Sequence, residues 1–171
     1  MLEPIAAVRE FLERGGDVLT WIGLVTFVMW ALILERLWYF RRVHPREAAR
    51  VGAVWDRRSD QTSWYAQRTR ELLLSQIKLQ LDQFIPMIKA LVALCPLLGL
   101  LGTVTGMIEV FDVMAIAGSS NARAMAAGVS KATIPTMAGM VAALSGLVFS
   151  VQIERFARDE AQRMEDRLAH H

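Results

Sequence analysis

Two threonines in the apolar part of the chain could offer polar groups to something that passes between helices. Thr103 lies in the segment CPLLGLLGTVTG, residues 95–106, where a proline and three glycines would destabilise a helix in water. In a bilayer, small residues let helices approach closely, and a threonine hydroxyl supplies a polar group between them. Thr136 lies in a second apolar segment of the same kind. Both threonines are therefore candidate polar points between closely packed membrane helices.

Small residues accompany each threonine at helical spacing. Gly102 and Gly106 form a G-x-x-x-G pair on the side of the helix that carries Thr103, and a second small-residue face continues from Thr136 to Ser150. Close packing of two antiparallel helices would explain both faces. Alternatively, both faces border a shared central space with the threonines as its polar points. The predicted framework comprises Pro96, Gly99, Gly102, Gly106, Gly139, Ala143 and Gly146.

Other chemistry has little support in the sequence. The single cysteine, Cys95, lies in an apolar run, and His44, His170 and His171 lie outside such runs, so we expect no disulfide framework and no metal or haem site. No nucleotide-binding loop or catalytic pair is present, so we expect neither an enzyme nor a cofactor nor a nucleic-acid partner. No carboxylate lies at the middle of an apolar run. A proton path would therefore need a titrating group from an inserted partner.

Three apolar runs must position these residues. Each is long enough to cross a hydrocarbon core, which takes about 20 helical residues. The sequence predicts an all-α membrane protein with three transmembrane helices, the second and third extended into the cytoplasm. The predicted segments are an amphipathic N-terminus (1–17), spans at 18–40, 84–111 and 132–153, a cytoplasmic helical segment (41–83), a periplasmic connection (112–131) and a cytoplasmic tail (154–171).

The distribution of basic residues predicts the orientation. Residues 35–83 carry ten Lys and Arg side chains and the tail after Ile153 carries four, whereas the N-terminus and the connection carry two each. Basic residues favour the cytoplasmic side, so we expect the N-terminus outside and the C-terminus inside.

The cytoplasmic parts show helical patterns. Five apolar residues recur every three or four positions from Leu73 to Ile88, which predicts one long helix from near Trp64 into the membrane, kinked at Pro86 or Pro96. A polar break at 56–63 separates it from a shorter predicted helix over 47–55. The mixed charges of residues 154–168 are typical of a solvated continuation of the third span. No strand is expected.

Two long segments resemble known motifs. PLLGLLGTVTGMIEVF, residues 96–111, resembles the second-span signature of the MotA/TolQ/ExbB proton-channel family, and GVSKATIPTMAGMVAALSGL, residues 128–147, resembles its third-span signature. The chain most resembles a short ExbB-type subunit of a TonB energising system. In that family Thr103 and Thr136 fall on pore-lining threonines, and the small residues fall on the framework.

The resemblance implies the assembly and its location. It implies a homo-oligomeric ring, a pentamer, in the bacterial inner membrane, around single spans of ExbD-like subunits that carry a membrane aspartate. Inward proton flow would then drive motion that a TonB-like protein passes to the outer membrane. The resemblance favours H⁺ over Na⁺ as the ion.

One charged position departs from the family pattern. Lys131 stands where many ExbB and TolQ chains have an acidic residue, so the role of that carboxylate cannot be transferred. Glu109 lies seven residues after Gly102, on the same helix face, near the predicted outer end. We hypothesise that Glu109 and Lys131 pair, or jointly set the charge of the outer mouth. The alternative is that both side chains simply reach headgroup-level water.

Two other functions stay open. The chain could serve a TolQ-like system or another stator of the same family, although MotA-type chains have an additional span and a larger cytoplasmic domain. It could also be a non-conducting helical scaffold of a membrane complex. A scaffold explains the glycines but gives no reason for both threonines to fall on motif positions.

Overall fold

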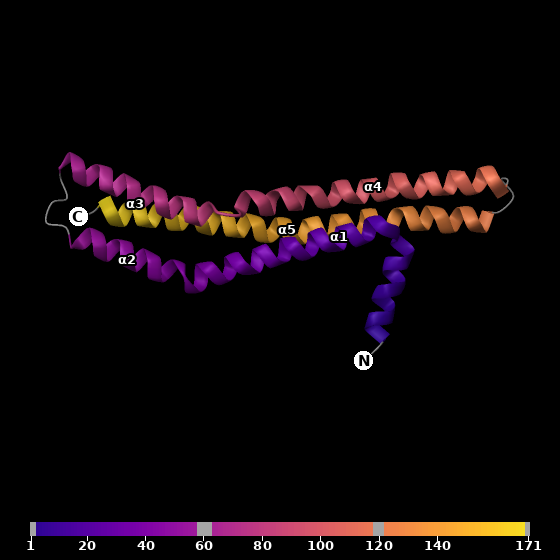
Figure 1. Cartoon of the computed structure of the whole chain (residues 1–171), viewed down its shortest axis with the longest axis horizontal. Coiled ribbons are helices and arrows are strands. Elements are labelled where there is room, and N and C mark those ends of the chain that lie inside the picture. Colours follow the sequence, from indigo (N-terminus) through magenta and orange to yellow (C-terminus); the bar gives the residue numbers. More distant parts are fainter. Residues whose placement is uncertain (1–2, 58–62, 118–121, 170–171) are drawn as a thin grey trace. The chain divides into compact units, whose positions relative to one another are not determined.

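The computed structural model describes residues 3–57, 63–117 and 122–169 of the chain. Every regular element in these ranges is a helix (Figure 1): α1 (Glu3–Arg42), α2 (His44–Asp56), α3 (Trp64–Asp82), α4 (Ile85–Ala117) and α5 (Ala122–Ala169). Three stretches are long and apolar enough to cross a membrane, namely Gly16–Arg42, Trp64–Ile116 and Met125–Leu168. The all-helical fold and the three candidate spans are confirmed, while orientation and ring assembly stay predictions.

The helices are longer than hydropathy alone indicated. α4 continues to Ala117, and α5 begins at Ala122 rather than at Ala132, so most of the predicted connection 112–131 is helical. The residues from Ala122 to Ala127 include four alanines, which favour helix although their hydropathy is lower than that of the span. Residues 118–121 of the connection lie outside the described part of the chain.

The predicted long helix from Trp64 is broken close to Pro86. α3 ends at Asp82, Gln83 has an extended ψ of 134°, and Phe84 has a φ of 64° before α4 begins at Ile85. Pro86 then lies in the first turn of α4, where its missing N–H costs nothing. An uninterrupted helix would instead place its ring against the carbonyl of Asp82, four residues earlier. α4 passes through Pro96 without a break, so Pro86 is the proline that interrupts the helix.

α1 contains a bend at Gly16. Its φ of 69° and ψ of −171° lie in a region that side chains rarely allow, and two helical segments meet there. The bend separates residues 3–15 from the first apolar run, which begins at Val18. Glycine is thus required where the predicted amphipathic N-terminus meets the first span.

The chain forms two compact units. The first unit joins Met1–Trp30 to Lys89–Leu147. It therefore contains α1 up to Trp30, most of α4, and α5 up to Leu147. Cys95, Ala142 and Ala143 form a buried cluster in this unit, with Val25 packed against it. Cys95 is fully buried, so its thiol packs inside this cluster.

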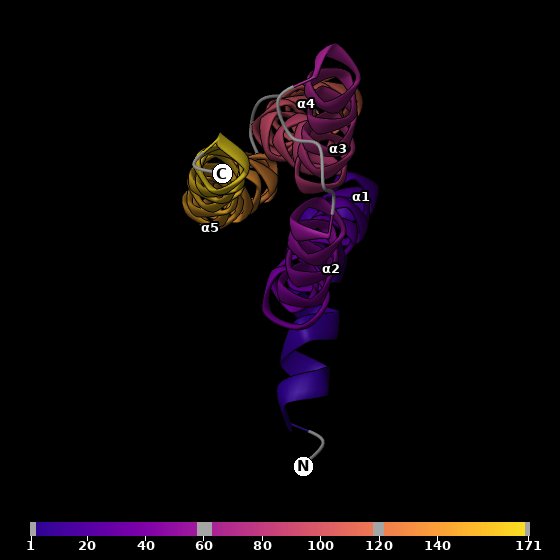
Figure 2. The same ribbon diagram turned by 90° about the vertical axis from the view of Figure 1, so that its left-hand side faces the viewer.

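The second unit joins Ala31–Ile88 to Val148–His171. Figure 2 looks along these helices and shows α2, α3 and the carboxyl end of α5 arranged around one another. The predicted apolar stripe of α3 supplies buried Ile77 and Leu81. Trp55 of α2, Ala66 of α3 and Leu168 of α5 form a further buried cluster. The predicted helix over 47–55 and the helical tail are both confirmed.

The N-terminus of α3 is capped by a side chain. Ser63 has an extended backbone, and its hydroxyl oxygen accepts a hydrogen bond from the Ala66 amide at 3.3 Å. Ser63→Ala should therefore destabilise the first turn of α3 by about 1 kcal/mol. Faster amide hydrogen exchange in residues 64–67 would show this effect. Ser75→Ala is the matched control, since Ser75 is exposed in the helix interior and alanine is favoured there. Equal exchange in both variants would contradict the capping role.

Candidate functional site

Thr103 and Thr136 meet at the contact between α4 and α5. Their hydroxyl oxygens form a short hydrogen bond. Thr136 Oγ1 lies 2.9 Å from the Gly99 carbonyl oxygen, and Thr103 Oγ1 lies 3.3 Å from the same atom. Both threonines are partly exposed in the single chain. The structure therefore brings together the two residues predicted to line the ion path.

The hydroxyl groups of the two threonines can still accept hydrogen bonds. Two hydroxyl protons are shared among three oxygens, so one threonine donates to the other and the second donates to the Gly99 carbonyl. Both protons are then used, but the hydroxyl oxygens retain acceptor lone pairs. Such a pair can accept a hydrogen bond from water or from a protonated carboxylic acid.

The framework glycines make this close approach possible. A Cβ atom built on Gly99 would lie 3.0 Å from Thr136 Cα, and one on Gly106 would lie 2.7 Å from Ala132 Cα. A Cβ on Gly139 would lie 2.5 Å from the Cys95 carbonyl oxygen. These neighbours are backbone atoms or lie next to the backbone, so they cannot move aside as a flexible side chain can. The glycines hold the two helix backbones in direct contact.

The remaining framework residues lie along the same helices. A Cβ on Gly102 would overlap the Pro135 ring, and one on Gly146 would overlap the side chain of Met29. Ala143 is buried, with 9% of its surface exposed, and Pro96 is half-buried within α4. The interpretation as closely packed antiparallel helices is confirmed for Gly99, Gly102, Gly106 and Gly139. Whether the threonine pair also faces an ion path stays a prediction.

Glu109 and Lys131 form the predicted ion pair. The distance from Lys131 Nζ to Glu109 Oε2 is 2.6 Å, and the pair connects α4 to α5. The side chain of Glu109 is 59% exposed and that of Lys131 is 40% exposed. They border a hollow of about 150 Å³ with Gly16, Asp17, Val18, Gly102, Thr105 and Gly106. The pairing is confirmed, and its role at an outer mouth stays a prediction.

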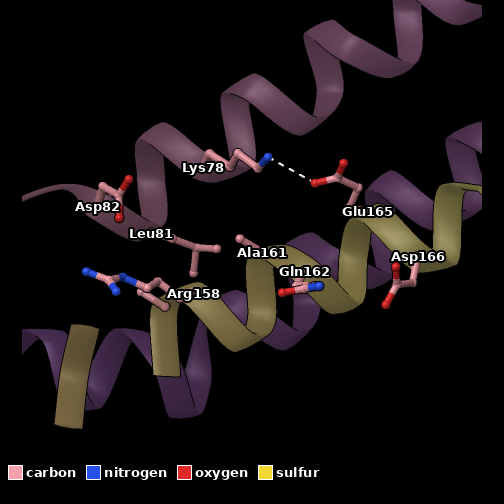
Figure 3. Close-up of a pocket in the computed structure, with 9 residues that line it drawn as sticks. Lys78, Leu81, Asp82, Arg158, Ala161, Gln162, Glu165 and Asp166 are labelled. Carbon is pink, nitrogen blue, oxygen red and sulfur yellow. Dashed lines mark hydrogen bonds and ion pairs between the residues drawn. The ribbon is translucent and has the colours of Figure 1, made fainter. Parts of the chain in front are cut away.

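A charged groove lies between α3 and α5 in the second unit. It has a volume of about 510 Å³, and apolar Leu81, Ala157 and Ala161 line part of it. Figure 3 shows Lys78 of α3 reaching toward Glu165 of α5, with a 3.1 Å separation between Nζ and Oε2. Both side chains of this pair are half-exposed. The groove is therefore a solvated contact between α3 and α5.

Arg36 is a residue whose environment the sequence did not reveal. By sequence, Glu35 and Arg36 are charges at the end of the first predicted span, a position that favours anchoring of the span in the membrane or docking of a partner. In the structure Arg36 is buried, with 1% of its surface exposed. Besides Glu35 and Tyr39 of its own helix, it contacts Gln80 at the end of α3 and Phe84 in the break that follows. No local spacing signal points to Gln80 and Phe84, because they lie more than 40 positions away in the sequence.

Comparison with known proteins agrees with the two motifs. Residues 42–166 match the sequence profile of the MotA/TolQ/ExbB proton channel family. A Synechocystis protein named ExbB-like 1 is 30% identical over 177 aligned residues, which cover 84% of this chain and 69% of that protein. ExbB-like 3 of the same organism is 32% identical over 89 residues, covering 48% of this chain and 42% of that protein. The chain belongs to the MotA/TolQ/ExbB proton channel family, and with its three candidate spans it is a multi-pass membrane protein.

Proposed function

We propose that this chain is an ExbB-like subunit that forms a proton channel and motor in the bacterial inner membrane. It uses the proton motive force, together with an ExbD-like single-span partner, to energise TonB-dependent transport across the outer membrane. The observation that carries this proposal is the threonine pair Thr103–Thr136, held at the α4–α5 contact by framework glycines. Family membership and the ExbB-like relatives support a stator-type role.

The chemistry of the pair defines what the partner must supply. In this proposal the partner's membrane aspartate carries the proton, because the hydroxyls have no proton of their own to release near neutral pH. In its protonated state the aspartate donates a hydrogen bond to a threonine oxygen. In its ionised state it draws the hydroxyl protons toward itself. The two threonines therefore interact with both charge states of the acid, which a moving proton carrier requires.

A ring arrangement follows from the same proposal. The spans leave many large apolar side chains exposed in the single chain, including Phe27, Leu97 and Met137 at 73%, 61% and 67%. Lipid tails or neighbouring copies of the chain would cover these apolar surfaces. We propose a homo-pentamer with the N-terminus in the periplasm and the C-terminus in the cytoplasm. A TolQ-like or other stator of the family is the second candidate, since the same threonine pair would serve it.

Native mass spectrometry tests the assembly that this function needs. The complex is extracted from its own membranes in mild detergent by a tag on this chain. Five copies together with a small single-span protein that has an acidic residue in its span is the expected result. A monomer or dimer, or a stable complex with unrelated large subunits, would instead support the non-conducting scaffold.

The Glu109–Lys131 pair provides a prediction about the outer mouth. Glu109→Gln leaves Lys131 unpaired, so the local charge becomes more positive and proton flux should fall several-fold. Folding should change little, because exposed pairs contribute about 1 kcal/mol or less. The exchanged pair Glu109→Lys with Lys131→Glu is the control, since it restores neutrality. Normal flux in Glu109→Gln, measured in proteoliposomes containing the whole complex, would show that the pair has no part in ion uptake.

A further inference from the structure

Arg36 is a buried cation at the break between α3 and α4. Its guanidinium donates a hydrogen bond from Nη1 to the Gln80 carbonyl oxygen at 3.0 Å. Gln80 lies in the last turn of α3, where backbone carbonyls lack partners within the helix. Arg36 on α1 therefore caps the carboxyl end of α3. A cation at this position also complements the negative end of the helix dipole.

Two aromatic rings hold the same guanidinium. Its central carbon lies 5.1 Å from the centre of the Tyr39 ring and 5.0 Å from the centre of the Phe84 ring, and both contacts are of the cation–π type. Glu35 lies 3.3 Å from Arg36 Nε, and its side chain is 45% exposed. The charge of Arg36 is thus compensated by one carboxylate, one helix end and two ring faces.

Phe84 has a backbone conformation that it would not adopt by itself. With a φ of 64° it lies in the left-handed region, which is unfavourable for a bulky residue. Such strain persists where the surrounding structure holds it, and it is common in segments that switch conformation. The side chain of Phe84 is the one that contacts Arg36. The strained residue and the buried cation therefore support one another.

The network extends to a third helix. The Tyr39 hydroxyl donates to Glu47 Oε2 of α2 at 2.8 Å and lies 3.4 Å from Gln80 Oε1 of α3. Arg36, Tyr39, Glu47, Gln80 and Phe84 consequently connect α1, α2, the end of α3 and the residue before α4. All five belong to the second compact unit.

We propose that Arg36 is a positioning residue that holds the α3–α4 break as a joint with two states. With Arg36 in place, Phe84 stays left-handed and α3 keeps its direction relative to α2. When Arg36 leaves the carbonyl and the ring, Phe84 relaxes to an ordinary conformation and α3 reorients. The inference goes beyond proton conduction and does not depend on it. It identifies the point at which the helix before a span can move independently of that span.

Spin-label distances measure the joint directly. Labels at Arg46→Cys on α2 and Gln76→Cys on α3 occupy exposed positions within one unit, in a Cys95→Ala background. The full chain is reconstituted in lipid nanodiscs, with labelled chains diluted by unlabelled ones. Arg36→Met keeps an unbranched, flexible side chain but loses the guanidinium and its charge. It should add a second distance population, because leaving the left-handed region favours the relaxed state about tenfold.

A second substitution separates strain from simple loss of packing. Asparagine tolerates the left-handed region, so Phe84→Asn added to Arg36→Met should restore the single distance population. Arg68→Met is the matched control, since Arg68 also stacks on a ring of α3, at 5.5 Å from Trp64, but is exposed. That control should leave the distribution unchanged.

Each outcome decides the proposal. A second population in Arg36→Met that disappears in the double variant supports the joint. An unchanged distribution in Arg36→Met, or a second population that persists in the double variant, overturns it. If Arg36→Met does not fold, recovery of folded protein in the double variant supports the proposal, and failure to recover overturns it.

Discussion

Replacing both Thr103 and Thr136 with valine should cut energised transport about tenfold or more while the complex still assembles. Valine keeps the volume of threonine but lacks the hydroxyl, so the α4–α5 contact keeps its shape. The partner's acid then loses its hydrogen-bond acceptors, and hydrogen bonds to charged groups contribute about 1.5 to 3 kcal/mol. That energy corresponds to about ten- to hundredfold in rate. Each single variant should show a smaller loss, because one hydroxyl remains at the Gly99 carbonyl.

Thr133 of α5 is the control. Its hydroxyl donates to the Ser130 carbonyl of its own helix at 2.9 Å and takes no part in the pair. Thr133→Val should leave transport near the wild-type level. Assembly is checked by the subunit count in native mass spectra. Full transport in both single variants and in the double variant would show that the threonine pair lines no ion path.

Gly139→Ala should separate α4 from α5 and lower stability by about 1 to 3 kcal/mol, the usual cost of overpacking. The added methyl group would meet the Cys95 carbonyl at 2.5 Å and Gly99 Cα at 3.2 Å, both of which are backbone atoms. Because the threonine pair depends on this separation, transport should be lost together with stability. The midpoint of thermal unfolding in detergent measures the loss. Gly106→Ala should behave similarly, since it meets Ala132 Cα.

Gly23→Ala is the matched control for Gly139→Ala. It lies in α1, and a Cβ built there meets nothing within 4 Å. Gly23→Ala should therefore unfold at the wild-type temperature or slightly above it, since alanine favours helix over glycine. A Gly139→Ala protein as stable as Gly23→Ala would mean that α4 and α5 do not pack as described.

Much of the first unit could be predicted from local patterns. Thr103 and Thr136 each lie on a small-residue face, and the spacing predicts that these faces either pack together or border a common space. In the structure the two hydroxyls meet. Glu109 is found by its place on the face of Gly102 and Lys131 by its departure from the family pattern, and the two form an ion pair. Hydropathy located the spans but missed the start of α5, because the alanines from Ala122 on favour helix without being strongly apolar.

Features set by long-range contacts could not be predicted. Pro86 indicated an interruption of the long helix. The left-handed backbone of Phe84, however, depends on the surrounding side chains. Arg36 looked like an ordinary interfacial arginine, and only the folded chain brings it to the end of α3. The sequence also left open whether the glycines pack helices or border a space. Atomic distances decide that glycines 99, 102, 106 and 139 are in helix contact.

Proton flux through the purified complex shows whether the threonine pair lines a proton path. The complex, isolated through this chain with its native partner, is placed in liposomes that enclose a pH-sensitive dye, and a membrane potential is imposed. We predict proton uptake that stops when a carboxylate-modifying reagent reacts with the partner's membrane acid, and that falls in the Thr103→Val, Thr136→Val double variant. Liposomes that stay as proton-tight as protein-free ones, or a flux unchanged in the double variant, would contradict the account.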